Sequence, residues 1–181
     1  MSFNRRILSP GATPFVNDEN FRVVLYTGNG GTQSITGVGF KPDFVWLKNR
    51  SQDNYAPRIF DSSRGATKRL QSSHPSVEST DSNSLTSFDA DGFTLGADNY
   101  VNNNGDSFVA WCWKAGGGTT SSNSDGEITV NVQANQDAGF SIVTFAGISD
   151  PGDDRSFAHG LSKEPEFIWM KRRESSQHPA V

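Results

Sequence analysis

Acidic and amide side chains gather in two neighbouring turn-like stretches, where they could supply oxygen ligands to a metal ion. Asp89 and Asp91 lie in the first stretch, and Asn102, Asn104 and Asp106 lie in the second. Ca²⁺ binds several carboxylate and carbonyl oxygens at once, so the two stretches could share an ion if they met. The spacing fits no EF-hand loop, and Asp, Asn and Gly are common at hairpin tips for backbone reasons alone. We therefore expect structural turns here, with no metal and no cofactor.

Carboxylates and histidines are the side chains that could act as catalytic groups. Glycoside hydrolysis needs one protonated and one ionised carboxyl group flanking a groove. Asp43 and Glu166 come closest to a pair, because each follows a proline at the start of an apolar run, where an acidic residue most simply stays solvated. The histidines His74, His159 and His178 lie in loop-like sequence, and no serine or thiol stands in a nucleophile elbow. The sequence predicts no catalytic residues and no enzymatic activity.

Aromatic side chains in loop-like stretches are the candidate contacts for a glycan, because an aromatic ring can stack on a sugar ring. Tyr55, Tyr100 and Phe157 lie in such stretches. Trp46 and Trp169 lie instead in alternating runs, at equivalent places of a repeated phrase, which favours core packing over ligand binding.

The repeated phrase is the most informative feature of the chain. FRVVLYTG at 21–28 returns as FSIVTFAG at 140–147, and KPDFVWLK at 41–48 returns as EPEFIWMK at 164–171. The substitutions keep size and polarity. Copying a packing unit is typical of modular or extended proteins, which gain length or valency in this way.

Short runs rich in Val, Ile, Phe, Thr and Trp, bounded by Gly, Pro, Asn and Asp, predict β-strands, and no segment has the pattern of a long helix. We expect strands near residues 21–27, 43–48, 57–61, 84–88, 92–95, 107–114, 127–133, 140–146 and 166–172. Many short strands at this spacing predict an all-β fold, either a sandwich or a barrel.

Two of these elements allow sharper predictions. Asp91-Gly92 is a dipeptide that suits a tight hairpin. In the run at 107–114, Trp111 and Trp113 alternate with Cys112, so both faces are apolar and the strand should be central in its sheet. A single cysteine allows no internal disulfide, and we expect it to be a small buried apolar residue.

Composition argues against several classes of function. Apolar residues make up 34% of the 181, and thirteen Phe, four Trp and three Tyr must supply much of the core. A net charge of −4 argues against nucleic-acid binding, which depends on clustered cations. The sequence predicts neither a signal peptide nor insertion into a membrane.

The chain divides into four stretches. We expect an irregular N-terminal arm at 1–20, a β-sandwich at 21–118, a Gly/Ser-rich linker at 119–126 and a partial second repeat at 127–181. Arg5 and Arg6 are the candidate anchoring residues of the arm, by contact with an acidic partner; the alternative is that this basic pair serves only solubility. The second copy lacks counterparts of residues 57–114, so its strands should complete a sheet with the first module or with a neighbouring subunit.

Four blocks in the first module resemble the repeat domain of tail-fibre-like virion proteins of tailed bacteriophages, especially marine ones. The resemblance covers about 21–118, with a partial copy at 140–173. The blocks are GFKPDFVWLKNR (39–50), RIFDSSRGATK (58–68), NSLTSFDADGFTLG (83–96) and SFVAWCWKAG (107–116).

The resemblance implies a concanavalin-like jelly roll, an antiparallel β-sandwich carried in virion appendages. It implies a non-enzymatic structural protein located in the virion, namely a tail fibre, an adaptor or a decorating protein, acting through assembly and host-surface contact. Its partners would be other virion proteins and further copies of itself. The alternative is a lectin-like module that binds a host cell-surface glycan.

Overall fold

The structure is a computed structural model that describes residues 19–147 and 155–174. Arg5, Arg6 and His178 lie outside the described residues. The described elements follow one another along the chain, and β-strands dominate. They are β1 (Phe21–Thr27), β2 (Gln33–Ile35), β3 (Phe44–Asn49), β4 (Arg58–Asp61), β5 (Lys68–Gln71), β6 (Ser79–Thr80), β7 (Leu85–Asp89), β8 (Gly92–Leu95), α1 (Asn99–Asn102), β9 (Ser107–Trp113), β10 (Ser121–Asn123), β11 (Val130–Asn135) and β12 (Phe140–Thr144).

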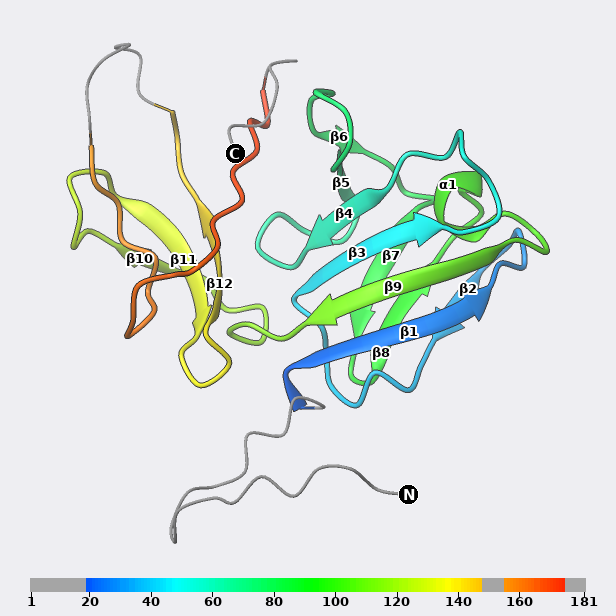
Figure 1. The fold of residues 1–181 in the computed structure, drawn as a ribbon, viewed down its shortest axis with the longest axis horizontal. Coiled ribbons are helices and arrows are strands. Elements are labelled where there is room, and N and C mark those ends of the chain that lie inside the picture. Colours follow the sequence, from blue (N-terminus) through cyan, green and yellow to red (C-terminus); the bar gives the residue numbers. More distant parts are fainter. Residues whose placement is uncertain (1–18, 148–154, 175–181) are drawn as a thin grey trace, which may run out of the picture.

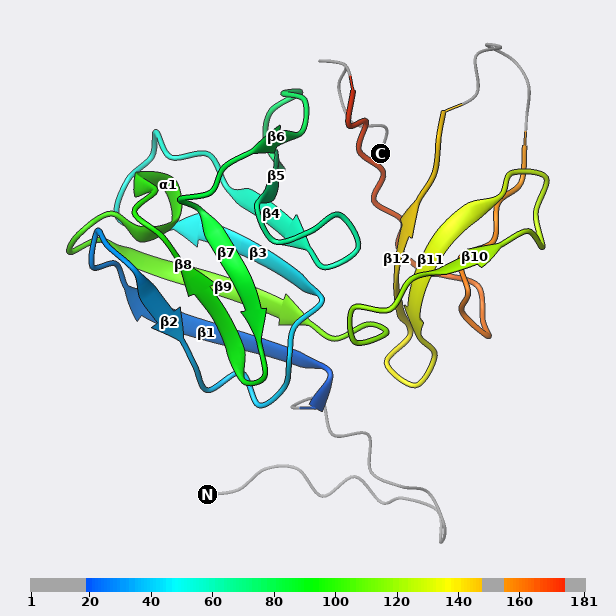
Figure 2. The same cartoon turned by 180° about the vertical axis from the view of Figure 1, so that it is seen from behind.

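The strands confirm an all-β antiparallel sandwich. A six-stranded sheet in the order β1-β9-β3-β4-β5-β6 lies in front of a three-stranded sheet in the order β2-β8-β7 (Figure 1), and Figure 2 shows the smaller sheet from behind. Alternate residues of each strand face the space between the layers. That space holds fully buried side chains from both sheets, among them Val45, Leu47, Phe60, Leu85, Phe93 and Leu95.

Strand β9 is central, as its two apolar faces predicted. It pairs with β1 on one edge and with β3 on the other. Cys112 points into the core and is 0% exposed, whereas Trp111 and Trp113 lie on the outer face of the large sheet. Burial raises the pKa of the Cys112 thiol to about 12, which makes it an inert apolar residue under ordinary conditions.

The Asp91-Gly92 hairpin is also confirmed, between β7 and β8. Asp89 pairs with Gly92, and Gly92 has φ +147°, a backbone conformation that glycine adopts freely. The Asp91 carboxylate accepts hydrogen bonds from the backbone N–H groups of Gly37 and Gly39, at 3.0 and 2.6 Å. The turn therefore ties the β7–β8 hairpin to the loop that follows β2.

A third sheet, in the order β10-β11-β12, lies beside the sandwich (Figure 1). Within the stretch 119–126, Ser121–Asn123 form β10, a strand that the sequence did not predict. The sequence also missed β2, β5, β6 and α1, all of which have four residues or fewer. Elements this short carry too few residues to show a period.

The strand predicted at 166–172 is wrong. Residues 166–172 have no assigned strand and join no ladder among the described residues. Their first-copy counterpart, β3, is a strand because β9 and β4 pair with its two edges. Within the described ranges the second copy has no such neighbours, so its matching residues are not paired into a sheet.

Candidate functional site

Two of the three candidate glycan contacts lie together at one end of the sandwich. Tyr55 lies in the loop between β3 and β4, and Tyr100 lies in α1. Their ring centroids are 5.0 Å apart at 55°. Asp98 caps α1 and accepts a hydrogen bond from the Tyr100 backbone N–H at 3.0 Å, which fixes the position of Tyr100. The fold thus builds a small aromatic cluster from residues 45 positions apart.

A buried arginine lies against this cluster. The Arg58 guanidinium carbon lies 3.8 Å from the centroid of the Tyr100 ring, a cation–π contact. Arg58 is 2% exposed, and burial, followed by the charge of Arg69, lowers its pKa, while Asp98 opposes that shift. Sequence reasoning missed Arg58. The available signal was a cation at the start of the otherwise apolar run at 57–61.

The polar atoms around Arg58 have unused hydrogen-bonding capacity. Arg58 Nε and Nη1 are buried without a partner, and so is Asp98 Oδ2. Buried polar groups are normally paired, because an unpaired one costs free energy. The atoms themselves are closed to solvent, so only the partly exposed rings of Tyr55 and Tyr100 could meet a ligand at this place.

The third candidate, Phe157, is placed elsewhere. Its ring stacks on Phe145, with centroids 4.9 Å apart at 27°, and its backbone bridges Ile128. Both contacts belong to the β10–β12 side of the molecule, whereas α1 lies at the opposite end of the sandwich (Figures 1 and 2). A single glycan contact built from all three predicted residues is therefore excluded.

A more extensive arrangement joins the two copies of the repeated phrase, and we call it the repeat interface. Phe140 on β12 is the second-copy counterpart of Phe21 on β1. Both rings pack against Trp113, Phe21 at 4.8 Å and Phe140 at 5.9 Å between centroids. Phe140 also packs edge-on to Phe44 at 5.9 Å. The first residues of the two copies therefore flank one tryptophan.

The second half of the phrase forms the other part of the repeat interface. Trp169 packs against its own counterpart, Trp46, at 5.4 Å between centroids, and against Phe44 at 6.5 Å. Trp46 in turn contacts Trp111 at 5.2 Å. Aromatic pairs at these distances stabilise by about 0.5–1.5 kcal/mol beyond the area that they bury. The repeated tryptophans thus bind the two copies to each other.

A buried polar network crosses the same interface. Asp43 Oδ2 accepts hydrogen bonds from the backbone N–H groups of Ala115 and Gly117 at 2.8 and 2.9 Å, and Asp43 Oδ1 accepts one from Ser62 Oγ at 2.8 Å. Gln133 on β11 donates to Ser62 Oγ at 3.0 Å and accepts from the Gly118 N–H at 2.7 Å. The expectation that Asp43 stays solvated is wrong, because the residue is 0% exposed. It is buried because it satisfies main-chain donors after β9.

Charged side chains also hold the described C-terminal residues, around Arg173, against the sandwich. The Arg64 side chain forms ion pairs with Asp61 and, at 3.0 Å, with Glu78. Glu78 also pairs with Arg173 at 2.9 Å, and its backbone N–H donates to the Arg173 carbonyl at 2.9 Å. Burial opposes ionisation of Glu78, but hydrogen bonds from Arg173 and Arg64 outweigh it and lower its pKa.

This ion pair predicts that the C-terminal segment loosens in acid. A carboxylate whose pKa is lowered on folding stabilises the fold fully above its unfolded pKa, near 4.5, and loses that contribution as the pH falls through the lower folded value. We expect the hydrogen-exchange protection of the Glu78 backbone N–H, which donates to the Arg173 carbonyl, to fall as the pH drops below about 4.5. Glu78→Gln should reduce that protection already at pH 7 and remove most of its pH dependence. Unchanged protection in the variant would contradict the role of this pair.

The turn carboxylates that could supply ligands to Ca²⁺ accept hydrogen bonds from nearby side chains. The Asp106 carboxylate accepts hydrogen bonds from Asn49 and Asn103, at 2.8 and 2.9 Å, and these lower its pKa. Asp89 accepts from Ser87 Oγ and Thr94 Oγ1. In the described ranges no three His, Cys, Asp or Glu side chains gather as a metal site would require. The same ranges contain no helix long and apolar enough to cross a membrane.

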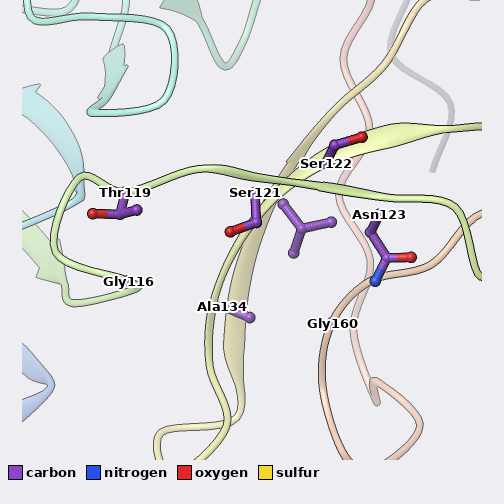
Figure 3. Close-up of a pocket in the computed structure, with 8 residues that line it drawn as sticks. Gly116, Thr119, Ser121, Ser122, Asn123, Ala134 and Gly160 are labelled. Carbon is purple, nitrogen blue, oxygen red and sulfur yellow. The ribbon is translucent and has the colours of Figure 1, made fainter.

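A cavity of about 380 Å³ opens on the β10–β11 side of the molecule. Figure 3 shows its rim, where Ser121, Ser122 and Asn123 of β10 lie beside Gly160. Its walls are small or polar and carry no ionisable group. The lining residues are Gly116, Thr119, Ser121, Ser122, Asn123, Val132, Ala134 and Gly160. This cavity offers hydrogen bonds but no acid–base group.

These features define the class of protein: an antiparallel β-sandwich to which part of a second copy is joined by aromatic and polar contacts. Comparison with known families then identifies it. The chain belongs to the family described as a domain of unknown function (DUF7483), whose model matches residues 17–181. No curated protein and no solved structure matches the chain.

Proposed function

We propose that this protein is a non-enzymatic structural component of a bacteriophage virion, a tail fibre, an adaptor or a decorating protein. It acts through assembly with other virion proteins and with further copies of itself, and through contact with the host surface. The observation that carries the proposal is the repeat interface, in which Trp169 packs on Trp46 and Phe140 shares Trp113 with Phe21. Residues copied in the sequence are used to join one copy to the other.

The exposed part of the second copy supports assembly. Ile168 and Met170 are 59% and 40% exposed, whereas their first-copy counterparts Val45 and Leu47 are both 0% exposed. Phe167, beside them, is 78% exposed. Large apolar side chains clustered at a surface are typical of sites that meet another protein. In an assembled particle these side chains would be covered as Val45 and Leu47 are.

The test of this proposal is the location of the protein in particles. Particles purified from an infected culture should contain the chain in a fixed ratio to the major capsid protein, measured by quantitative mass spectrometry. Cryo-electron microscopy should then place its density on a virion appendage or surface with a defined copy symmetry. Absence of the chain from purified particles would overturn the virion proposal.

A second candidate function is glycan binding by a lectin-like module, favoured by the tyrosine cluster. Tyr55 and Tyr100 provide partly exposed aromatic rings with centroids 5.0 Å apart, and the Arg58 guanidinium packs on the Tyr100 ring. A glycan array should show binding by the unaltered chain and its loss in Tyr55→Ala. Phe157→Ala is the matched control, since Phe157 lies apart from the cluster. Binding that survives Tyr55→Ala, or no binding at all, would reject this function.

A further inference from the structure

Strand β1 forms one edge of the large sheet in the described part of the chain. It is seven residues long and pairs with β9 on one side, and among the described residues no strand pairs with its other side (Figures 1 and 2). Val23 and Leu25, on its outer face, are 44% and 62% exposed. Long, regular, apolar edge strands readily pair with another strand, so natural proteins usually shorten or charge them. The opposite edge of the same sheet, β6, has only two residues.

We propose that β1 pairs antiparallel with β1 of a second copy of this chain, about a two-fold axis at Val24. This inference rests on the assembly part of the proposed function and names one of its surfaces. The pairing joins two six-stranded sheets into one continuous sheet.

The backbone register follows from the pairing with β9. The Asn20 backbone carbonyl accepts a hydrogen bond from the Lys114 N–H at 2.8 Å, and the Gly28 N–H donates to the Asp106 backbone carbonyl at 2.9 Å. The even-numbered residues of β1 therefore exchange hydrogen bonds with β9. The N–H and C=O groups of odd-numbered residues therefore point to the free edge. One of these groups, the Thr27 carbonyl, already accepts from Gln33 Nε2 at 3.0 Å. A carbonyl oxygen has a second lone pair for another donor.

A two-fold axis at Val24 places each odd-numbered residue opposite another odd-numbered residue. Phe21 then faces Thr27 of the second copy, and Val23 faces Leu25. These are hydrogen-bonded pairs, each exchanging two bonds, so the strands form about eight main-chain hydrogen bonds. Every outward backbone group of β1 is then satisfied. An axis at Val23 or Leu25 also pairs odd residues with each other, but it leaves an end of each strand unpaired.

The same register brings the two exposed apolar side chains into contact. Within one chain Val23 lies beside Trp111, and Leu25 lies beside Val109. In the pair of chains Val23 of one copy lies against Leu25 of the other, and the reverse contact follows from the symmetry. The outer-face row of Trp46, Trp111 and Val23 would continue through Leu25 and Val109 of the second copy. A self-complementary edge of this kind favours a second copy over an unrelated strand.

Pairing of one strand covers less surface than a standard protein interface, so we expect a dimer that depends on concentration. Light scattering after size-exclusion chromatography should show about twice the 19.7 kDa mass of one chain at high concentration. Leu25→Lys should reduce that doubling several-fold, since it replaces both apolar contacts between Val23 and Leu25 with contacts to a hydrated charge. Val77→Lys is the matched control, because Val77 is a similarly exposed apolar residue outside β1, at 42%. Dimers that persist unchanged in Leu25→Lys would overturn the inference.

Cross-linking tests the register itself. Val23→Cys and Leu25→Cys chains, mixed and oxidised with copper phenanthroline, should form a disulfide-linked dimer in several times the yield of either variant alone. Directly opposed residues lie within disulfide reach, whereas residues of the same number are diagonal neighbours about 7–8 Å apart. Cys112 does not interfere, because it is 0% exposed.

The outcomes separate this inference from the proposed function. A mixed-specific cross-link together with dissociation by Leu25→Lys supports pairing through β1. Oligomers that persist in Leu25→Lys and give no cross-link specific to the mixed cysteine variants would show that the chain assembles through another surface. The inference about β1 would then be wrong, while the proposal that the chain assembles with copies of itself would be supported. A chain that stays monomeric at high concentration overturns pairing through β1, and its presence in purified particles still decides the virion proposal.

Discussion

Asp43→Ala should lower the free energy of unfolding by about 2–4 kcal/mol. The substitution removes the carboxylate that accepts hydrogen bonds from the buried Ala115 N–H and from the Gly117 N–H. Ser62 would lose one of its partners and with it part of the contact to Gln133. For a chain of this size we expect the melting temperature to fall by about 5–15 °C. Urea unfolding followed by tryptophan fluorescence gives the free energy directly.

The comparison with Asp43→Asn makes this prediction specific. The amide oxygen can keep both main-chain hydrogen bonds, and the amide N–H can donate to Ser62 Oγ, so the loss should be less than half of that in Asp43→Ala. Asp53→Ala, at an exposed position, is the matched control and should change stability by less than about 0.5 kcal/mol. Equal losses in the alanine and asparagine variants would mean that charge, and not hydrogen bonding, explains the burial of Asp43.

Gly92→Ala should be at least as damaging. A Cβ at this position would lie 1.9 Å from the backbone oxygen of Ile35 on β2, and the residue has φ +147°. Backbone cannot yield as a flexible side chain can, so β8 must shift away from β2. Overpacking of this kind costs about 1–3 kcal/mol and an unfavourable φ adds about 1–2 kcal/mol. We expect a total loss of about 2–5 kcal/mol, measured by the same unfolding experiment.

Gly105→Ala separates the two contributions to that loss. Gly105 also has a positive φ, +82°, but a Cβ there would meet nothing within 4 Å. This variant should therefore lose only the conformational part, about 1–2 kcal/mol. If Gly92→Ala proved no worse than Gly105→Ala, the close approach of β8 to β2 would not constrain position 92.

Patterns that depend on neighbouring residues were enough to predict much of this fold. Alternation located most of the longer strands, the two apolar faces of 107–114 placed β9 in the middle of its sheet, and Asp91-Gly92 marked a hairpin. Cys112 was predicted to be a small buried apolar residue and is 0% exposed. Strand period and turn chemistry are local properties, which explains why the sequence carried them.

Predictions from neighbouring residues were wrong where the structure depends on contacts between distant strands. Residues 166–171 resemble β3 closely in sequence, yet no strand forms there, because a strand needs neighbours to accept and donate its main-chain hydrogen bonds. The prediction that Asp43 stays solvated was wrong for a related reason. Its burial depends on donors at Ala115 and Gly117, which are more than 70 positions away.

The sequence by itself determined the fold class, the duplication and the types of residue available for recognition. Only the tertiary structure decided that Tyr55 and Tyr100 meet over Arg58 while Phe157 lies elsewhere, and that the repeated tryptophans pack on each other. It also showed that, within the described ranges, β1 is an edge strand of the large sheet. The physical reason is that strand period is set by adjacent residues, whereas burial and contact are set by which distant strands the chain brings side by side.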